Sequence, residues 1–294
     1  MERHSRTLGT AAGALSLTVL ATLATACSSG GGAAHPAGDG ASPAASAPSG
    51  AASASTGTGS STDAAAWARW GLTPLPPTPA PPADRPIKLT RTGKVPVFRS
   101  VATDQKVVFI TVDDGAEKDP AFVRMMQDLR VPITMFLMND TIKTNYDYFK
   151  PLQALGDSIQ NHTLHHPAMN TISEAQQKTE VCGDQKIITD HYGTAPYLFR
   201  PPYGAGAYSA SLNSAVQACG PRAIVYWKET MQITGMQYQA GDKKLQDGDI
   251  ILAHFRGPSE LKGETMTQMF ANLLKRIQEQ GFAVARLDDY IQQP

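Results

Sequence analysis

The chain has 294 residues, with 26 lysines and arginines against 26 aspartates and glutamates, so its formal charge is zero with neutral histidine. This balance argues against a nucleic-acid binder, because such proteins usually neutralise phosphates with a basic excess. Hydrophobic residues make up 41% of the chain, which is enough for a packed core in part of it. The three cysteines are too few for a disulfide-dense small domain.

Residues 1–27 have the pattern of an export signal. Arg3 and Arg6 give a positive start, a short apolar run follows, and small residues precede Cys27. The run is too short to span a bilayer as a permanent helix. A cysteine directly after small residues resembles the lipobox of bacterial lipoproteins, which predicts lipidation of Cys27 and a place on the outer face of the cell membrane. Plain secretion is the alternative.

Residues 28–86 are expected to form a disordered tether. Nearly every position over 28–66 is Ser, Gly, Ala, Pro or Thr, and residues 72–86 hold seven prolines. Such compositions bury too little apolar surface to fold, and they give a flexible and then a stiffer spacer. Between the two stretches, Trp67 and Trp70 can dock on the folded domain, touch lipid headgroups or belong to the free linker.

The folded domain is therefore expected over residues 87–294, where strands and helices alternate. Strands are predicted over 107–112, 133–138, 158–160, 197–199, 223–227, 249–253 and 282–286, and helices over 119–130, 146–155, 173–191, 209–218 and 264–280. Repeated β–α units favour a parallel sheet, open or closed as a barrel, with reactive residues where the strands end. Cys182 and Cys219 predict one disulfide in an exported protein, with two buried free thiols as the alternative.

Acidic and histidine residues follow the first and third of these strands. Asp113 and Asp114 are adjacent, and if Asp114 ligates a metal, Asp113 stays free for acid–base chemistry. A solvated Asp-Gly turn is the alternative. His162, His165 and His166 lie within five residues, and in a helical turn His162 and His166 share a face. Because imidazole is a favoured ligand of Zn²⁺, the cluster indicates a metal site.

Two further residues stand at later strand ends. Arg200 opens an Arg-Pro-Pro-Tyr-Gly segment, and its guanidinium can pair bidentately with a carboxylate. His254 ends an apolar strand, and histidine is the most frequent general acid or base near neutral pH. A surface loop for Arg200 and a structural role for His254 are the alternatives.

Together and in this order, these motifs resemble the polysaccharide deacetylases of carbohydrate esterase family 4, the NodB-like domain. The matching segments are Asp113-Asp114, His162-x-x-x-His166, Arg200-x-Pro-Tyr and Leu-x-His254. The resemblance covers roughly residues 100–290 and implies an α/β fold, a distorted (β/α)7 barrel of polysaccharide-deacetylase type.

The resemblance also implies roles for the site residues. Asp114, His162 and His166 correspond to the ligands of a divalent metal, for which Zn²⁺ is the first expectation and Co²⁺ or another divalent ion the alternative. Asp113 corresponds to the general base, and Arg200 to the residue that orients and charge-stabilises it.

The general acid and the substrate contacts depend on a segment that departs from the family pattern. His254 corresponds to the general acid, which the family tunes with an aspartate of its fourth motif. Here residues 225–232 contain Trp227 and no aspartate, so Glu229 is the candidate partner of His254. By family analogy the Tyr203 backbone N–H is a second oxyanion donor. Tyr203 and Trp227 are also predicted to stack on sugar rings, with ordinary packing as the alternative.

The implied activity is metal-dependent hydrolysis of N-acetyl groups on a polysaccharide outside the membrane, peptidoglycan first and chitin-like N-acetylglucosamine polymers next. An O-acetyl ester such as acetylated xylan uses the same machinery. A different class of function is a catalytically weakened, glycan-binding envelope lipoprotein, which the altered fourth motif suggests. The expected partners are the acetylated polysaccharide and, through the lipid anchor, the membrane, and the expected state is a monomer.

Overall fold

In the computed structural model, the described residues are 63–239 and 241–293, all within one unit, Ala54–Pro294. The predicted export signal, Cys27 and most of the predicted tether lie outside them. Within these two ranges no helix has the length and apolar character needed to cross a membrane.

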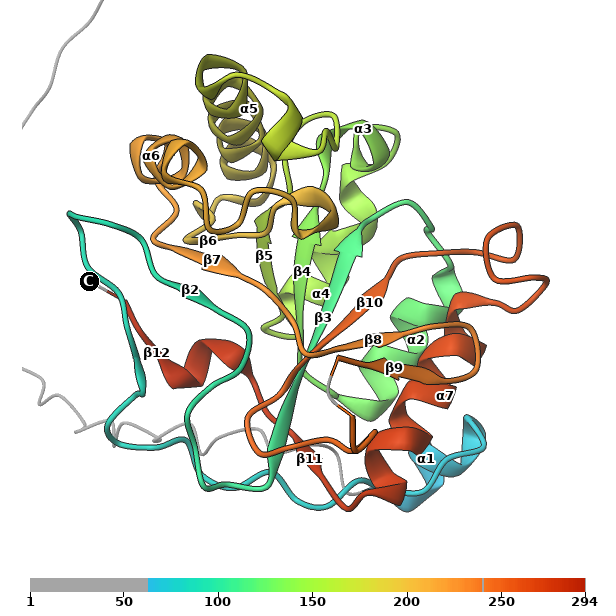
Figure 1. Ribbon diagram of the computed structural model, residues 1–294. Helices are drawn as coiled ribbons and strands as arrows, with labels where there is room; N and C mark the ends of the chain where they lie inside the picture. The colour runs from blue at the N-terminus through green and yellow to red at the C-terminus, as the bar shows by residue number, and fades with distance from the viewer. Residues whose placement is uncertain (1–62, 240, 294) are drawn as a thin grey trace, which may run out of the picture. The chain divides into compact units, whose positions relative to one another are not determined.

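A curled, ten-stranded sheet forms the centre of the fold (Figure 1). Its order is β2-β7-β6-β5-β4-β3-β10-β8-β9, with β11 paired to β3 off this path. The strands are β2 (Val97–Phe98), β3 (Val107–Asp114), β4 (Ile133–Leu137), β5 (Ser158–Asn161), β6 (Leu198–Phe199), β7 (Ala223–Val225), β8 (Glu229–Met231), β9 (Met236–Tyr238), β10 (Ile250–His254) and β11 (Ala283–Val284). All pairs are parallel except the β8–β9 hairpin.

The expected α/β architecture is thus present as a curled half-barrel. The sheet path ends at β2 on one side and β9 on the other, so it has more strands than the seven expected and the path stays open. A separate parallel pair joins β1 (Ile87–Lys88) to β12 (Ile291–Gln292). The β8–β9 hairpin was not predicted, because its two three-residue strands are too short to show a hydrophobic period.

Helices cover the sheet (Figure 1). They are α1 (Ala64–Arg69), α2 (Pro120–Leu129), α3 (Asn139–Ile142), α4 (Lys150–Ala154), α5 (Glu174–Tyr192), α6 (Ala210–Cys219) and α7 (Met266–Glu279), with 3₁₀ turns η1 (Tyr146–Phe149), η2 (Met169–Thr171), η3 (Pro202–Gly204) and η4 (Leu287–Tyr290).

Local sequence determines where the long helices begin. The Asp119 side chain accepts the Ala121 N–H at the start of α2, with proline in the first helical position. Ser173 and Gln176 form a complete capping box at the start of α5, as the sequence predicts. The same arrangement opens α7, two residues later than expected, because Thr265 is the N-cap.

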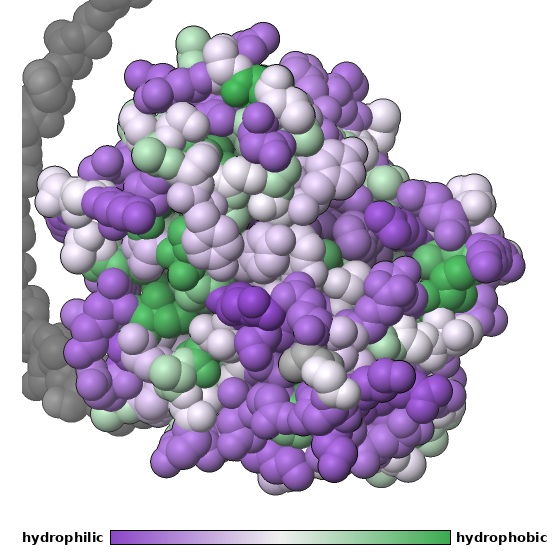
Figure 2. Space-filling model, viewed as in Figure 1, coloured by the Kyte–Doolittle hydropathy of each residue, from purple (hydrophilic) through white to green (hydrophobic). Residues whose placement is uncertain are grey.

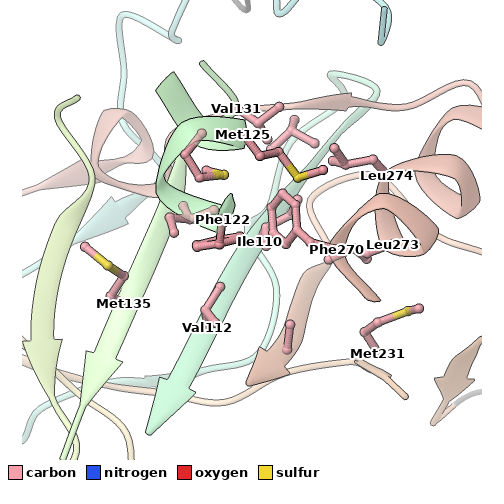
Figure 3. Close-up of a cluster of buried hydrophobic side chains, with 14 of the residues drawn as sticks. Ile110, Val112, Phe122, Met125, Val131, Met135, Met231, Phe270, Leu273 and Leu274 are labelled. Atoms are coloured by element: carbon pink, nitrogen blue, oxygen red, sulfur yellow. The ribbon is translucent and has the colours of Figure 1, made fainter. Parts of the chain in front are cut away.

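The main core lies between the sheet and helices α2 and α7 (Figure 3). Its labelled members are buried side chains of the sheet, of these helices and of the loop after α2: Ile110, Val112, Phe122, Met125, Val131, Met135, Met231, Phe270, Leu273 and Leu274. Every residue of β3 before Asp114 is buried, as its continuous apolar run predicts. Burial of each large apolar side chain stabilises the fold by about 1.5–3 kcal/mol, so the ends of these strands are held rigidly.

The folded domain starts earlier than residue 87, which corrects the tether prediction. α1 buries Trp67 completely in the main core, and Leu72 and Leu75 are buried after it. The proline-rich composition of this part, 63–86, does not prevent packing, because these three side chains supply the apolar surface that the rest of the predicted tether lacks. Of the alternatives for Trp67, docking on the domain is the one realised.

Candidate active site

The site is built where β3 and β10 end side by side. These parallel strands pair in register, with His254 opposite Asp113. Side chains at paired positions of neighbouring strands point to the same face of a sheet, so the predicted acid and base are adjacent. Parallel strands end at the same edge of the sheet, and their arrowheads point the same way in Figure 1.

Three ligand atoms converge at this edge. Asp114 Oδ1 lies 3.4 Å from His162 Nε2 and 3.3 Å from His166 Nε2. The donor atoms of the three residues all lie within 4.8 Å of one another. Asp114 Oδ1 is also buried and makes no hydrogen bond with any described residue. A buried, unpartnered carboxylate oxygen between two imidazole nitrogens fits a divalent cation of the Zn²⁺ type.

The tautomer of His162 favours the same interpretation. Its Nδ1 lies 2.7 Å from the backbone oxygen of Arg200. Because a carbonyl only accepts, Nδ1 carries a proton, and in the neutral imidazole Nε2 is then the nitrogen that can bind a cation beside Asp114.

The histidine segment reaches this geometry without the predicted helical turn. Residues 162–168 form an irregular loop in which Thr163 and His166 have positive φ angles of 78° and 58°. The left-handed residues turn His166 back toward Asp114. The His165 ring points elsewhere, with its Nδ1 2.8 Å from Asp140, and is not among the converging ligands.

Asp113 is held by a fully buried arginine. Arg200 Nη1 donates to Asp113 Oδ1 at 2.7 Å and to Thr111 Oγ1 at 2.8 Å, and Nε donates to the Val225 oxygen at 3.2 Å. Burial lowers the pKa of Arg200, and the Asp113 carboxylate opposes that shift. The pair leaves Asp113 Oδ2 free, 3.7 Å from His162 Nε2. Thr111 was not among the predicted site residues, because a threonine inside an apolar strand is common.

The carboxylate and imidazole pKa values are strongly perturbed. Burial raises the pKa of Asp114, but its interactions with His162 and His166 outweigh burial and hold the pKa well below 3.8. Burial lowers the pKa of His254 to about 4, although Asp113 and Asp114 favour its charged form. In the metal-free protein the His254 imidazole is therefore neutral at pH 7.

The prediction that Glu229 partners His254 is wrong. Glu229 on β8 pairs in register with Ile251, three positions before His254 on β10. At about 3.3 Å per residue this separates the two by about 10 Å along the strand. Glu229 instead interacts with Asp249, and burial together with that second carboxyl raises the pKa of Glu229 to about 8.

Aromatic residues border the ligand cluster. Tyr203 is 71% exposed, and its ring centre lies 4.7 Å from that of His166. Trp227 is partly buried, stacks on Tyr226 with ring centres 4.4 Å apart, and lies 5.5 Å from the Arg200 guanidinium carbon. Tyr203 thus has a face open to solvent beside the site, whereas Trp227 takes part in packing around Arg200.

The two remaining cysteines are joined. Cys182 of α5 and Cys219 of α6 form a disulfide. This covalent bond lies in the pair of helices beside the histidine loop, which makes contact with α5.

Comparisons with known proteins identify the family of the chain. A family model for polysaccharide deacetylase matches residues 100–224. An uncharacterised protein of Streptomyces coelicolor is 37% identical over 214 residues, which cover 72% of this chain and 82% of that protein. A peptidoglycan-N-acetylglucosamine deacetylase of Bacillus cereus is 24% identical over 200 residues, 65% of this chain and 91% of that enzyme.

The fold is shared as well. The solved structure of a CE4 family pseudoenzyme from Bacillus anthracis matches with a TM-score of 0.54 and 18% identity, over 67% of this chain and 70% of that chain. Sequence, fold and motif order agree, and the chain belongs to the polysaccharide deacetylase family, carbohydrate esterase family 4.

Proposed function

We propose that this protein is a metal-dependent N-deacetylase that acts on peptidoglycan outside the cell membrane. Family membership supports deacetylase activity on glycans. The observation that carries the finer proposal is the convergence of Asp114, His162 and His166 donor atoms within 4.8 Å, next to the Asp113–Arg200 pair.

The donor set favours Zn²⁺, because two imidazoles and one carboxylate suit a borderline-soft ion better than Mg²⁺ or Ca²⁺. A bound divalent ion would polarise the acetamide carbonyl and lower the pKa of a water molecule. Asp114, His162 and His166 would hold it.

The chain's own residues supply the proton transfers. Asp113 accepts the proton of the attacking water through Oδ2, since Arg200 occupies Oδ1. His254 donates a proton to the departing sugar nitrogen, which would otherwise be a poor leaving group. The neutral His254 imidazole takes up that proton from solvent before the step, Asp113 releases the proton of the water to solvent after it, and the neighbouring Asp113 and Asp114 favour the charged form of His254.

The proposed substrate rests on a relative of known name, and the proposed location rests on the N-terminal sequence. The Bacillus cereus relative acts on peptidoglycan N-acetylglucosamine, as its name states. The export signal and Cys27 favour a lipoprotein on the outer face of the membrane, where that polymer lies. The exposed Tyr203 ring beside His166 is suited to contact a sugar.

A second candidate function is glycan binding with little or no turnover. It is favoured by Glu229, which does not reach His254 and so leaves the acid without the carboxylate that the family pattern supplies. The structural similarity to a family pseudoenzyme is compatible with this alternative.

Acetate release from peptidoglycan and from N-acetylglucosamine oligomers, with added Zn²⁺ or Co²⁺, tests the proposal. We expect metal-stimulated release by the full chain and background release by His162→Ala. His165→Ala is the matched control, because this neighbouring histidine points to Asp140 and should keep its activity. Equal acetate release by wild type and His162→Ala would contradict the proposed enzymatic activity. Saccharide binding without acetate release would support glycan binding as the function.

A further inference from the structure

The histidine loop is held from outside by one turn of α5. Asp184 Oδ2 accepts the backbone N–H of His162 at 3.1 Å, and Glu180 Oε2 accepts that of His165 at 2.9 Å. Glu180 and Asp184 are four residues apart and so share one face of the helix. Neither residue was singled out by the sequence, since acids inside a helix usually face solvent.

The same turn contacts the loop between these two acids. The backbone oxygen of Val181 accepts a hydrogen bond at 2.9 Å from Nδ2 of Asn161, the last residue of β5 before the loop. At Gly183, an added Cβ would lie 2.4 Å from the Leu164 side chain, so any larger residue would force Leu164 to move from this close contact. Residues 180–184 therefore form a cradle for the loop, and we call this segment the α5 cradle.

The loop requires such support. Thr163 and His166 hold left-handed conformations that non-glycine residues adopt only at an energetic cost. That strain persists only where the surroundings fix the backbone. The acceptors of the α5 cradle, at His162 and His165, stand directly beside the two strained positions.

Stabilisation of the fold does not explain why an aspartate occupies position 184. Its side chain is completely buried, and Oδ1 has no hydrogen-bond partner among the described residues. Burial raises the pKa of the Asp184 carboxyl well above its usual range, and a buried carboxyl group with one oxygen lacking a partner destabilises a fold relative to an apolar side chain of similar size. Its contacts are with backbone N–H groups of His162, Thr163 and Asn139, which indicates that it serves the position of the histidine loop and of the start of α3 beside it.

The disulfide anchors the α5 cradle. Cys182 lies at its centre and is bonded to Cys219, the last residue of α6. Displacement of the turn along or away from α6 is thereby restricted. The bond therefore limits how far Glu180 and Asp184 can move from the loop.

We propose that Glu180 and Asp184 are positioning residues for the metal ligands His162 and His166, and that the Cys182–Cys219 disulfide preserves the affinity of the site by fixing the α5 cradle. This inference rests on the proposed metal site. It assigns to the disulfide a role in ligand geometry in addition to any effect on the unfolded chain.

Titration of the full, metal-stripped chain with Co²⁺ tests the inference. Replacement of hydrogen-bond partners that orient metal ligands typically weakens binding by about 10–100-fold, and we expect this for Asp184→Ala and a smaller loss for Cys182→Ser/Cys219→Ser. Asp184→Asn keeps an acceptor for the His162 N–H and should restore most of the affinity. Asp190→Ala is the matched control, because this exposed acid of α5 pairs with Lys186.

Amide hydrogen exchange of the metal-free protein gives a second readout. We expect faster exchange in residues 162–166 of Asp184→Ala while β3 stays protected. Should that variant fail to fold, Glu180→Ala and the double serine variant carry the same comparison.

A purely structural role predicts a lower melting temperature with unchanged Co²⁺ affinity and loop exchange, and that result would overturn the inference. If the wild-type protein binds no Co²⁺, the proposed function and this inference both fail. If the wild type binds Co²⁺ and the variants bind it equally well, only this inference fails.

Discussion

Arg200 carries a positive charge in a completely buried position. The free-energy cost of removing this charge from water depends on the groups that contact it. The guanidinium is paired with Asp113, bonded to Thr111 and to backbone oxygens, and lies 4.2 Å from the centre of the Phe136 ring. Such a set of fixed donors holds Asp113 in one orientation. At the residue scale, the position of the proposed base is thus determined by a side chain that comes from another strand end.

Removal of Arg200 should be strongly destabilising. Arg200→Met leaves Asp113 as an uncompensated buried charge, and we expect a loss of about 3–5 kcal/mol in the free energy of unfolding, measured by urea denaturation. Asp113→Asn in the same chain should recover part of the loss. The control is Arg276→Met, an exposed arginine paired with Glu279, for which a change below about 1 kcal/mol is expected. Similar losses for both arginines would contradict this account.

At the scale of elements, β8 and β10 carry a second carboxyl pair at their amino ends. Glu229 and Asp249 are both buried, and Lys228 Nζ lies 3.7 Å from Asp249 Oδ1. Burial, with Asp249 next, raises the pKa of Glu229 to about 8. The pair therefore holds a proton at neutral pH and belongs to the pairing of these strands, away from the proposed active site.

Glu229→Gln should flatten the dependence of the free energy of unfolding on pH between about 4.5 and 8. A carboxyl whose folded pKa is raised binds more protons when folded, so its favourable contribution is present at low pH and lost as pH rises from about 4.5 through 8. We expect the variant to be more stable than wild type at pH 8.5 by about 1–3 kcal/mol, with little difference at pH 4.5. Melting temperatures across this range, with exposed Glu279→Gln as control, measure the effect, and parallel profiles for wild type and Glu229→Gln would refute it.

At the scale of the whole molecule, the segment 63–88 binds the domain along several elements. Trp70 Nε1 donates to Asp128 of α2 at 2.9 Å, and Thr78 Oγ1 donates to the backbone oxygen of Val284 at 2.8 Å. Arg85 Nη1 donates to the backbone oxygen of Ile291 at 3.0 Å. The predicted tether therefore ends no later than residue 63, and the proline-rich part is a strap of the folded domain.

Figure 2 shows that this view of the surface is mainly polar, with apolar residues in separate small areas.

Segment 63–88 should contribute to the free energy of unfolding of the whole domain. Trp67→Ala removes a completely buried tryptophan, and we expect a loss of about 3–5 kcal/mol in the free energy of unfolding. Tyr208→Ala, at a tyrosine that is 68% exposed, should change it by about 0.5 kcal/mol or less. Thermal and urea unfolding of the two variants check this. If Trp67→Ala is as stable as Tyr208→Ala, segment 63–88 does not stabilise the domain and this prediction is wrong.

Residues that are close in sequence were predictable, because their effects are local. The caps of α2 and α5 follow from Asp119 and Ser173, and the buried run of β3 follows from its apolar side chains. The fold class and the motif order were sufficient to bring Asp114 together with His162 and His166, since strand ends in a parallel sheet share an edge.

Only the tertiary structure decided which distant groups meet. The register of β8 against β10 separates Glu229 from His254, and no local pattern encodes the pairing register of two strands. Contacts from Asp184 and Glu180 on α5 hold the histidine loop in a left-handed path that the His-x-x-x-His spacing suggested would be helical. The docking of Trp67 likewise depends on a core built from α2, α7 and the sheet, because an apolar side chain is buried only where other elements provide the surface to cover it.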